Sequence, residues 1–166
     1  MLLRASLIMA FALVLSACGW QLRGAGAIPL DGIPVAVVTE ANLPEVEREL
    51  RRGMERAGAV LVDEREQAEA VLVLISEQRR RRASAVDRDA RAQEYELEYG
   101  LRFRVESPEG EPWGVSEVVT NTRSYRYDRD DVLATEAREE VVLEELRRDT
   151  TRLLLARAQA TMGRNL

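Results

Sequence analysis

The sequence YELEYGLRFRV, at residues 95–105, alternates between apolar side chains and charged side chains or glycine. A period of two residues places successive side chains on opposite faces of an extended chain. We therefore predict a long β-strand here, with one face packed in a hydrophobic core and the other in contact with water.

Three further elements are predicted after this strand. The segment SPEGEP, at residues 107–112, is rich in residues that favour turns and predicts a reversal of the chain. A strand is then expected from Trp113 to Tyr127, followed by a helix from Asp131 onward. Apolar residues recur in this last segment at steps of three and four, as on one buried helix face: Ala134, Ala137, Val141, Val142, Leu146, Leu153, Leu154 and Ala158.

Before the alternating strand, the pattern predicts a strand, a helix and another strand. The β-branched run IPVAVVT, at residues 33–39, is typical of a strand. Asn42 and Glu45 have the spacing of a capping box and predict the start of a helix, which Gly58 would end. The run AVLVLI, at residues 70–75, is entirely apolar and predicts a strand buried on both faces.

Together these elements predict one domain over residues 33–166, with the order β-α-β-β-β-α. The segment contains no repeat and no linker that would indicate a second domain. Two amphipathic helices on one face of a sheet bury the apolar surfaces of both layers. We therefore predict an α+β fold in which two helices pack on one face of a four-stranded mixed sheet.

A cluster of arginines precedes the alternating strand. Residues 79–91 contain six arginines and two aspartates, a local charge of +4 in a chain whose net charge is −5. Such a run is usually a solvated surface, but arginine forks also bind phosphate groups in pairs of hydrogen bonds. We therefore name candidate residues for binding the phosphates of lipopolysaccharide: Arg88, Arg91, Arg79 and Arg81.

An antiparallel hairpin that reverses near residue 89 accounts for part of this cluster. The register that matches apolar faces places Ile75 near Phe103 and Val73 near Val105. Arg79 and Arg81 would then lie at the distal end of the apolar face, beyond the helices. The same register produces two oppositely charged cross-strand pairs: Arg80 with Glu98 and Arg82 with Glu96.

The first 17 residues have the pattern of a bacterial lipoprotein signal peptide. Arg4 is followed by an apolar core at residues 5–15, and the sequence LSAC at residues 15–18 resembles a lipobox. The core is shorter than the roughly 20 residues that span a bilayer. The other interpretation is an ordinary signal peptide with an accidental thiol at Cys18, the chain's one cysteine.

We predict that Cys18 carries an S-diacylglycerol and an N-acyl chain and that residues 18–32 form a lipidated N-terminus and tether. More than one acyl chain is enough for stable attachment to a membrane. Gly19 occupies the position at which an aspartate usually retains lipoproteins in the inner membrane. The protein is therefore expected on the periplasmic side of the outer membrane.

The composition excludes several kinds of chemistry. The chain has no histidine, and lipidation would occupy its one cysteine, so Ser-His-Asp and Cys-His catalysis and the usual zinc sites are excluded. It also lacks a phosphate-cradling glycine loop. We predict a protein that is not an enzyme, has no catalytic residues or metal site, and needs no cofactor besides the lipid on Cys18. The acidic charge argues against nucleic-acid binding.

Three segments together resemble one family. The predicted mature start is CGWQLR at residues 18–23, the alternating strand begins with QEYEL at residues 93–97, and the last helix contains EEVVLEELRRDTTRLLL at residues 139–155. In motif, order and length, the chain resembles the LptE family of lipopolysaccharide-assembly lipoproteins.

This resemblance implies an outer-membrane lipoprotein that plugs the LptD β-barrel, helps it to fold, and assists delivery of lipopolysaccharide to the outer leaflet. It also implies direct binding of lipopolysaccharide by basic residues. Arg88 lies seven residues before Tyr95, where the family pattern places one of them, and the second position aligns closest to Thr135. Three residues are further candidates for contact with the barrel or within the tether: Trp20, Leu22 and Arg23.

Two other classes of protein stay open at this point. The first is an auxiliary lipoprotein of a lipid transporter or cell-wall enzyme, which would share the anchor and the α+β domain but not the CGWQLR start. The second is a hydrolase that uses two carboxylates. With 29 acidic residues some close pair is inevitable, so a pair alone does not favour a hydrolase.

Overall fold

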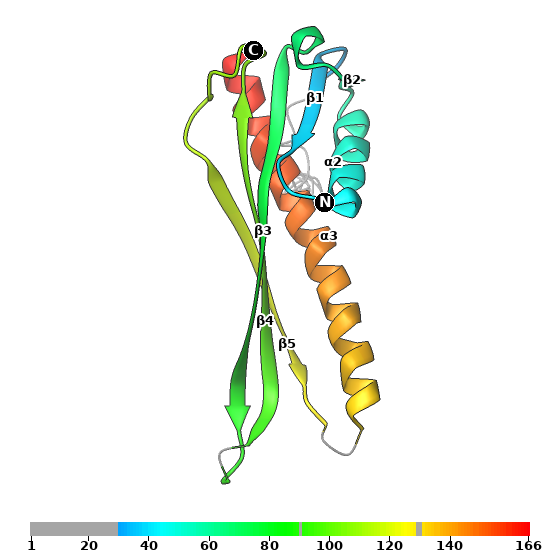
Figure 1. The fold of residues 1–166 in the computed structure, drawn as a ribbon, viewed down its shortest axis with the longest axis vertical. Helices are drawn as coiled ribbons and strands as arrows, with labels where there is room; N and C mark the ends of the chain where they lie inside the picture. Colours follow the sequence, from blue (N-terminus) through cyan, green and yellow to red (C-terminus); the bar gives the residue numbers. More distant parts are fainter. Residues whose placement is uncertain (1–29, 90, 129–130) are drawn as a thin grey trace, which may run out of the picture.

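The structure, a computed structural model, describes residues 30–89, 91–128 and 131–166. Within these residues the chain forms five strands, two helices and one 3₁₀ turn (Figure 1). In chain order they are β1 (Pro34–Thr39), α2 (Pro44–Arg56), β2 (Val60–Val62), η1 (Arg65–Gln67), β3 (Ala70–Val86), β4 (Ala92–Glu106), β5 (Glu117–Arg126) and α3 (Val132–Asn165).

β4 contains the alternating segment and lies between β3 and β5 in the sheet. The apolar side chains at its odd positions are at most 4% exposed from Leu97 to Val105, and they face the main core. The prediction of a long strand with one buried face is therefore confirmed.

The sheet is mixed, with the strand order β2-β1-β3-β4-β5. β1 pairs in parallel with both β2 and β3, whereas β3, β4 and β5 pair antiparallel. The α+β class is confirmed, but the prediction of four strands is wrong because Val60–Val62 adds a fifth at one edge. This strand has three residues and is only partly buried, so it is too short for a pattern of alternation to reveal it.

α2 begins differently from the prediction. Its N-cap is Leu43, no side chain caps the helix, and Pro44 occupies the first turn, so the capping box of Asn42 and Glu45 does not form. Proline suits this position because a backbone N–H in the first turn has no partner within the helix, so no hydrogen bond is lost when proline lacks it. The predicted end is confirmed, since Gly58 follows the helix with φ of +90°, a conformation that favours glycine.

α3 is long enough to run beside the whole hairpin. Its 34 residues rise about 51 Å at 1.5 Å per residue, and the 15 residues of β4 extend about 50 Å. The Asp131 side chain caps the helix by accepting a hydrogen bond from the Ala134 N–H at 3.0 Å, which confirms the predicted start. In Figure 1 the helix follows the β3–β4–β5 ribbon toward its tip, while α2 accompanies only the opposite end.

The main core lies between the two helices and one face of the sheet. Its buried side chains come from both helices and from four strands, and the fully buried ones include Val35, Leu50, Met54, Leu72, Leu74, Tyr99, Phe103, Leu146, Leu154 and Met162. Leu30 also belongs to it, so the packed chain includes residues just before β1. The prediction that both helices cover one face is confirmed.

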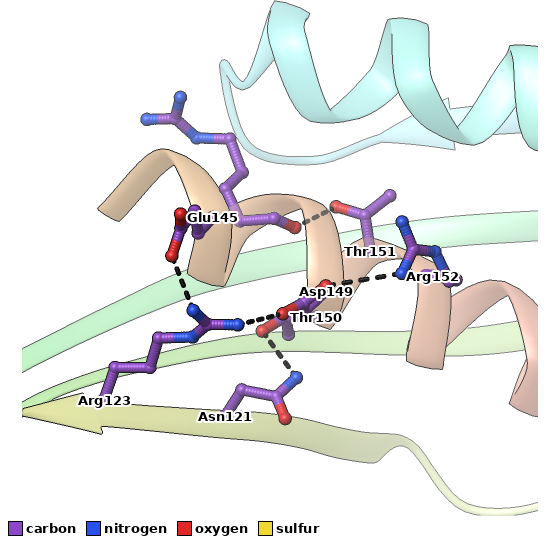
Figure 2. A network of polar contacts seen from close by, with 8 residues as sticks. Asn121, Arg123, Glu145, Asp149, Thr150, Thr151 and Arg152 are labelled. Atoms are coloured by element: carbon purple, nitrogen blue, oxygen red, sulfur yellow. Dashed lines mark hydrogen bonds and ion pairs between the residues drawn. The ribbon is translucent and has the colours of Figure 1, made fainter. Parts of the chain in front are cut away.

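Polar contacts join β5 to α3. Figure 2 shows Arg123 donating hydrogen bonds to Glu145 and, at 2.9 Å, to Asp149. Asn121 donates to the Thr150 hydroxyl at 3.1 Å.

β5 itself, at Glu117–Arg126, is shorter than the strand predicted from Trp113 to Tyr127.

A β-bulge at Ile75 changes the register of the hairpin along its length. Near the helices Leu74 pairs with Phe103, whereas the next pair is Ser76 with Arg102. The prediction that Ile75 pairs with Phe103 is therefore wrong by one residue. The bulge follows residues 70–74, which are buried on both faces of β3, so the apolar run there has no polar positions from which the register could be predicted.

The opposite face of the sheet carries a smaller apolar cluster and a buried ionic network. Ala36, Val71 and Val73 are almost fully buried there. The Glu106 carboxylate accepts hydrogen bonds from Arg65, at 2.6 Å, and from Arg104, which also donates to Glu40 at 2.7 Å. Burial alone would raise the pKa of Glu106, but the two guanidinium groups more than offset burial and lower it.

We expect Glu106→Gln to destabilise the domain by about 2 kcal/mol at neutral pH, because it weakens charge-assisted hydrogen bonds at a buried position. The pKa of Glu106 is lower in the folded state than in the unfolded state. The stabilisation that its carboxylate provides is therefore complete above about pH 5 and declines as the pH falls below about 4. Urea unfolding of both proteins from pH 3 to 7 measures the difference. The exposed Glu66→Gln is the control, and a difference independent of pH would contradict the ionic explanation.

Candidate functional site at the hairpin tip

The connection between β3 and β4 is built around Asp87. Its carboxylate accepts hydrogen bonds from the backbone N–H groups of Asp89 and Arg91, both at 2.9 Å. This turn leaves Arg88 exposed, and in the described part of the chain its side chain has no hydrogen bond or ion pair. Arg91 lies 3.5 Å from Asp89, so Arg88 is the cation of the turn that has no counter-charge among the described residues.

Two predicted arginines lie in a different environment from the tip. Arg79 and Arg81 face the same side of the sheet as the helices, as predicted, but they do not lie beyond the helices. α3 extends over them, and both residues line a shallow pocket with Leu97, Glu139 and Leu143. The prediction about the reach of the helices is therefore wrong, because α3 continues to the tip end of the hairpin.

Arg81 is held by three partners. Its guanidinium donates to the Glu139 carboxylate at 2.9 Å and lies 4.7 Å from the ring centroid of Tyr95. Glu139 also accepts a hydrogen bond from the Tyr125 hydroxyl. The bonds to Glu139 and Tyr125 raise the pKa of Arg81, while burial followed by the bond to Glu139 raises the pKa of Tyr125 to about 12. Arg81 therefore stabilises the junction of sheet and helix.

Aromatic rings surround this junction. The Tyr95 ring stacks on Tyr125 with centroids 6.0 Å apart, and it meets Tyr127 edge to face at 5.3 Å. Tyr125 is buried in the main core, and Trp113 packs against that core elsewhere. The tyrosines thus act in packing at this end of the sheet.

The cross-strand charge pairs at the far end of the hairpin are confirmed. Arg80 pairs with Glu98 at 3.5 Å and Arg82 pairs with Glu96, both on the face without helices. Arg79 lies 3.5 Å from Glu77. Of the six arginines between residues 79 and 91, only Arg88 therefore lacks a carboxylate partner among the described residues.

The start of α3 lacks the basic residue that the family resemblance implies. Thr135 is buried, and its hydroxyl donates to the backbone carbonyl of Asp131 at 3.1 Å. The exposed Arg138, less than one turn later, donates to the Arg126 carbonyl at 3.3 Å and supplies positive charge near this position. Sequence reasoning missed Arg138; the helical period alone would have placed it on the outer face.

Several predicted residues lie outside the described residues: Cys18, Trp20, Leu22 and Arg23. Among the residues that are described, no three or more His, Cys, Asp or Glu side chains come together as metal ligands would. None of the described helices is both long and apolar enough to cross a bilayer.

Comparison with known families gives one match over most of the chain. A model of the LptE family, described as lipopolysaccharide-assembly, matches residues 33–158. No curated protein sequence gives a match.

Solved structures of lipoproteins share the fold. An uncharacterized lipoprotein B from Nitrosomonas europaea is similar with a TM-score of 0.72 at 22% identity, over 87% of this chain and 93% of that one. The rare lipoprotein B from Shewanella oneidensis has a TM-score of 0.66 at 22% identity, over 80% and 97% of the two chains. A minor lipoprotein from Acinetobacter baumannii has a TM-score of 0.65 at 19% identity, over 81% and 96%.

We expect Arg81→Ala to destabilise the domain by about 1 kcal/mol, because it removes an ion pair and a cation–π contact that are partly exposed. Arg88→Ala should change stability by less than about 0.5 kcal/mol, since its side chain has no hydrogen bond or ion pair with the described residues. Urea unfolding midpoints measure both effects. Equal changes in the unfolding midpoints of the two variants would contradict the interpretation that Arg81 stabilises the fold and Arg88 does not.

Proposed function

Since this chain belongs to the LptE family of lipopolysaccharide-assembly lipoproteins, we propose that it plugs an LptD-like β-barrel in the outer membrane and helps the barrel to assemble. It would be anchored through acyl chains on Cys18 and would assist delivery of lipopolysaccharide to the outer leaflet. The family match over residues 33–158 is the observation that carries this proposal.

The length of the domain supports a position inside a barrel. The hairpin and α3 extend about 50 Å, and a bilayer with its headgroup regions is roughly 40–45 Å thick. A domain of this length would extend through a barrel from the periplasmic end to the external end. A compact domain of the same mass would not have this reach.

The charged face of the sheet also supports this position. Strands β3 and β4 carry paired arginines and glutamates on the face without helices. The lumen of a wide outer-membrane barrel is polar and hydrated, so a plug needs a polar surface. Because these charges are already paired with each other, the face can approach a barrel wall without an excess of positive charge.

The two ends of the domain would then have separate roles. Leu30, the first described residue, donates its N–H to the Ala57 carbonyl, at the end where β1 and β3 begin. Arg88 lies at the opposite end, beyond the last residue of β3. An anchor at Cys18 would hold the first end at the inner leaflet, because the 12 residues to Leu30 reach at most about 40 Å. The tip would point toward lipopolysaccharide in the outer leaflet.

The barrel proposal predicts a stable complex. Affinity purification of this protein from detergent-solubilised outer membranes should recover one large β-barrel protein in a ratio near one to one. Depletion of this protein should reduce the amount of folded barrel, because the plug assists assembly. Recovery with an inner-membrane transporter or a peptidoglycan enzyme instead would contradict the proposal and favour an auxiliary lipoprotein.

The tip proposal predicts weaker binding of lipopolysaccharide on removal of its arginines. Arg88→Ala with Arg91→Ala should weaken binding by about tenfold or more, since charge-assisted bonds to phosphate are worth about 1.5–3 kcal/mol. Fluorescence titration with labelled lipopolysaccharide measures this. The matched control removes two exposed arginines near the C-terminus, Arg157→Ala with Arg164→Ala. Unchanged affinity of the tip variant, with its fold intact, would contradict the proposal.

A further inference from the structure

A second arginine cluster lies between the two helices, near the end of the domain opposite the tip. A groove of about 220 Å³ separates α2 from α3, and a second depression continues it along the same helices. Charged side chains line it from both sides: Arg48, Arg52, Arg56, Arg147, Arg148 and Arg152, with Glu45, Glu49 and Glu144. Six arginines against three glutamates give the groove a net charge of +3 in an acidic chain.

The glutamates of the groove are already paired. Glu45 accepts a hydrogen bond from Arg147 at 2.7 Å, and Glu49 accepts one from Arg56 at 3.0 Å. Glu144 accepts from Arg148. The three carboxylates of the groove are therefore paired with Arg147, Arg56 and Arg148. No glutamate of the groove is left to neutralise its other three arginines.

Arg152 takes its counter-charge from outside the groove. It lies 3.4 Å from Asp149, which also accepts a hydrogen bond from Arg123 of β5 (Figure 2). The shared carboxylate neutralises Arg152 only in part. In the same view Thr151 points to the α2 side of α3, whereas Asp149 and Thr150 point toward β5. Thr151 also lines the groove, and its hydroxyl donates to the backbone carbonyl of Arg147 at 2.8 Å.

Arg48 and Arg52 have no partner in the described part of the chain. They are exposed, lie one helical turn apart on α2, and make no hydrogen bond or ion pair there. Like charges four residues apart on a helix repel each other. Across the groove they face α3, whose nearest basic residues are also arginines.

The two helices pack closely beside this groove. Gly53 of α2 packs against Leu155 of α3 so closely that a Cβ atom at Gly53 would lie 2.1 Å from the Leu155 Cδ1 atom. Both positions are buried in the main core or beside it. The packing of the core therefore holds arginines from two helices around one groove.

We propose that this groove is an anion site, in which the Arg48 and Arg52 guanidinium groups bind a phosphate group. Guanidinium forks match two oxygens of a phosphate, and two forks one turn apart can hold a phosphate monoester or diester between them. The phosphate belongs either to a membrane lipid headgroup or to a small soluble phosphate. This inference does not depend on the barrel or on the hairpin tip.

Thermal unfolding of the full, lipid-anchored chain in nonionic detergent tests the site. Sodium phosphate at ten times its Kd should raise the Tm by about 3–5 °C relative to sodium chloride of equal ionic strength, because the ligand binds the folded chain. In Arg48→Ala with Arg52→Ala the rise should fall below about 1 °C. The control Arg157→Ala with Arg164→Ala should keep the full rise.

A second set of probes distinguishes the source of the phosphate. Micelles that contain phosphatidylglycerol are compared with micelles that contain phosphatidylcholine, and each is tested on both double variants. A larger rise in Tm with phosphatidylglycerol than with inorganic phosphate supports a lipid headgroup, and the reverse supports a soluble phosphate. The proposal would be overturned if neither inorganic phosphate nor phosphatidylglycerol raised the Tm relative to chloride and phosphatidylcholine. Equal losses in both double variants, or a larger rise with polyglutamate than with either phosphate probe, would also overturn it.

Discussion

The antiparallel pairing of β3 with β4 sets the length of the domain, and the other elements are arranged along it. The two strands pair from Val71 with Glu106 to Val86 with Ala92. β1 accompanies β3 only as far as Leu74, so β4 is the one sheet neighbour of β3 beyond that point in the described chain. A two-stranded ribbon is marginal in water. β5 and α3 therefore have to continue along the ribbon, which explains why the last helix is so much longer than α2.

The bulge at Ile75 decides how charge is distributed over this ribbon. It shifts the phase of β3 by one residue, so that Arg80 and Arg82 face away from the helices and meet glutamates of β4. Arg79 and Arg81 turn toward α3, where Glu139 neutralises Arg81. Without the extra residue, the arginine pairs would exchange faces. The hydrophobic contacts near the helices and the ion pairs near the tip thus require different registers, and the bulge reconciles them.

Much of this arrangement could be predicted from the residues themselves. Strict alternation in β4 identified its buried face, and opposite charges identified the register near Arg80 and Glu98, because both patterns have polar positions that fix the phase. The phase of AVLVLI could not be read, since a strand buried on both faces has no polar positions. The partners of Arg81 could not be predicted either. Its contact with Glu139 depends on how α3 crosses the ribbon, 58 residues later in the chain.

The arginines divide into those that the fold neutralises and those that it does not. In the ribbon, several arginines have a carboxylate on the facing strand or helix, and such pairs carry little net charge into a confined space: Arg80, Arg81, Arg82 and Arg123. Arg88 at the tip, and Arg48 and Arg52 in the groove between α2 and α3, lack this compensation among the described residues. An uncompensated cation loses hydration energy when a barrel wall or a membrane approaches it, unless an anion replaces the lost water. For a domain inside a hydrated barrel, these are therefore positions at which an external anion would contribute to stability.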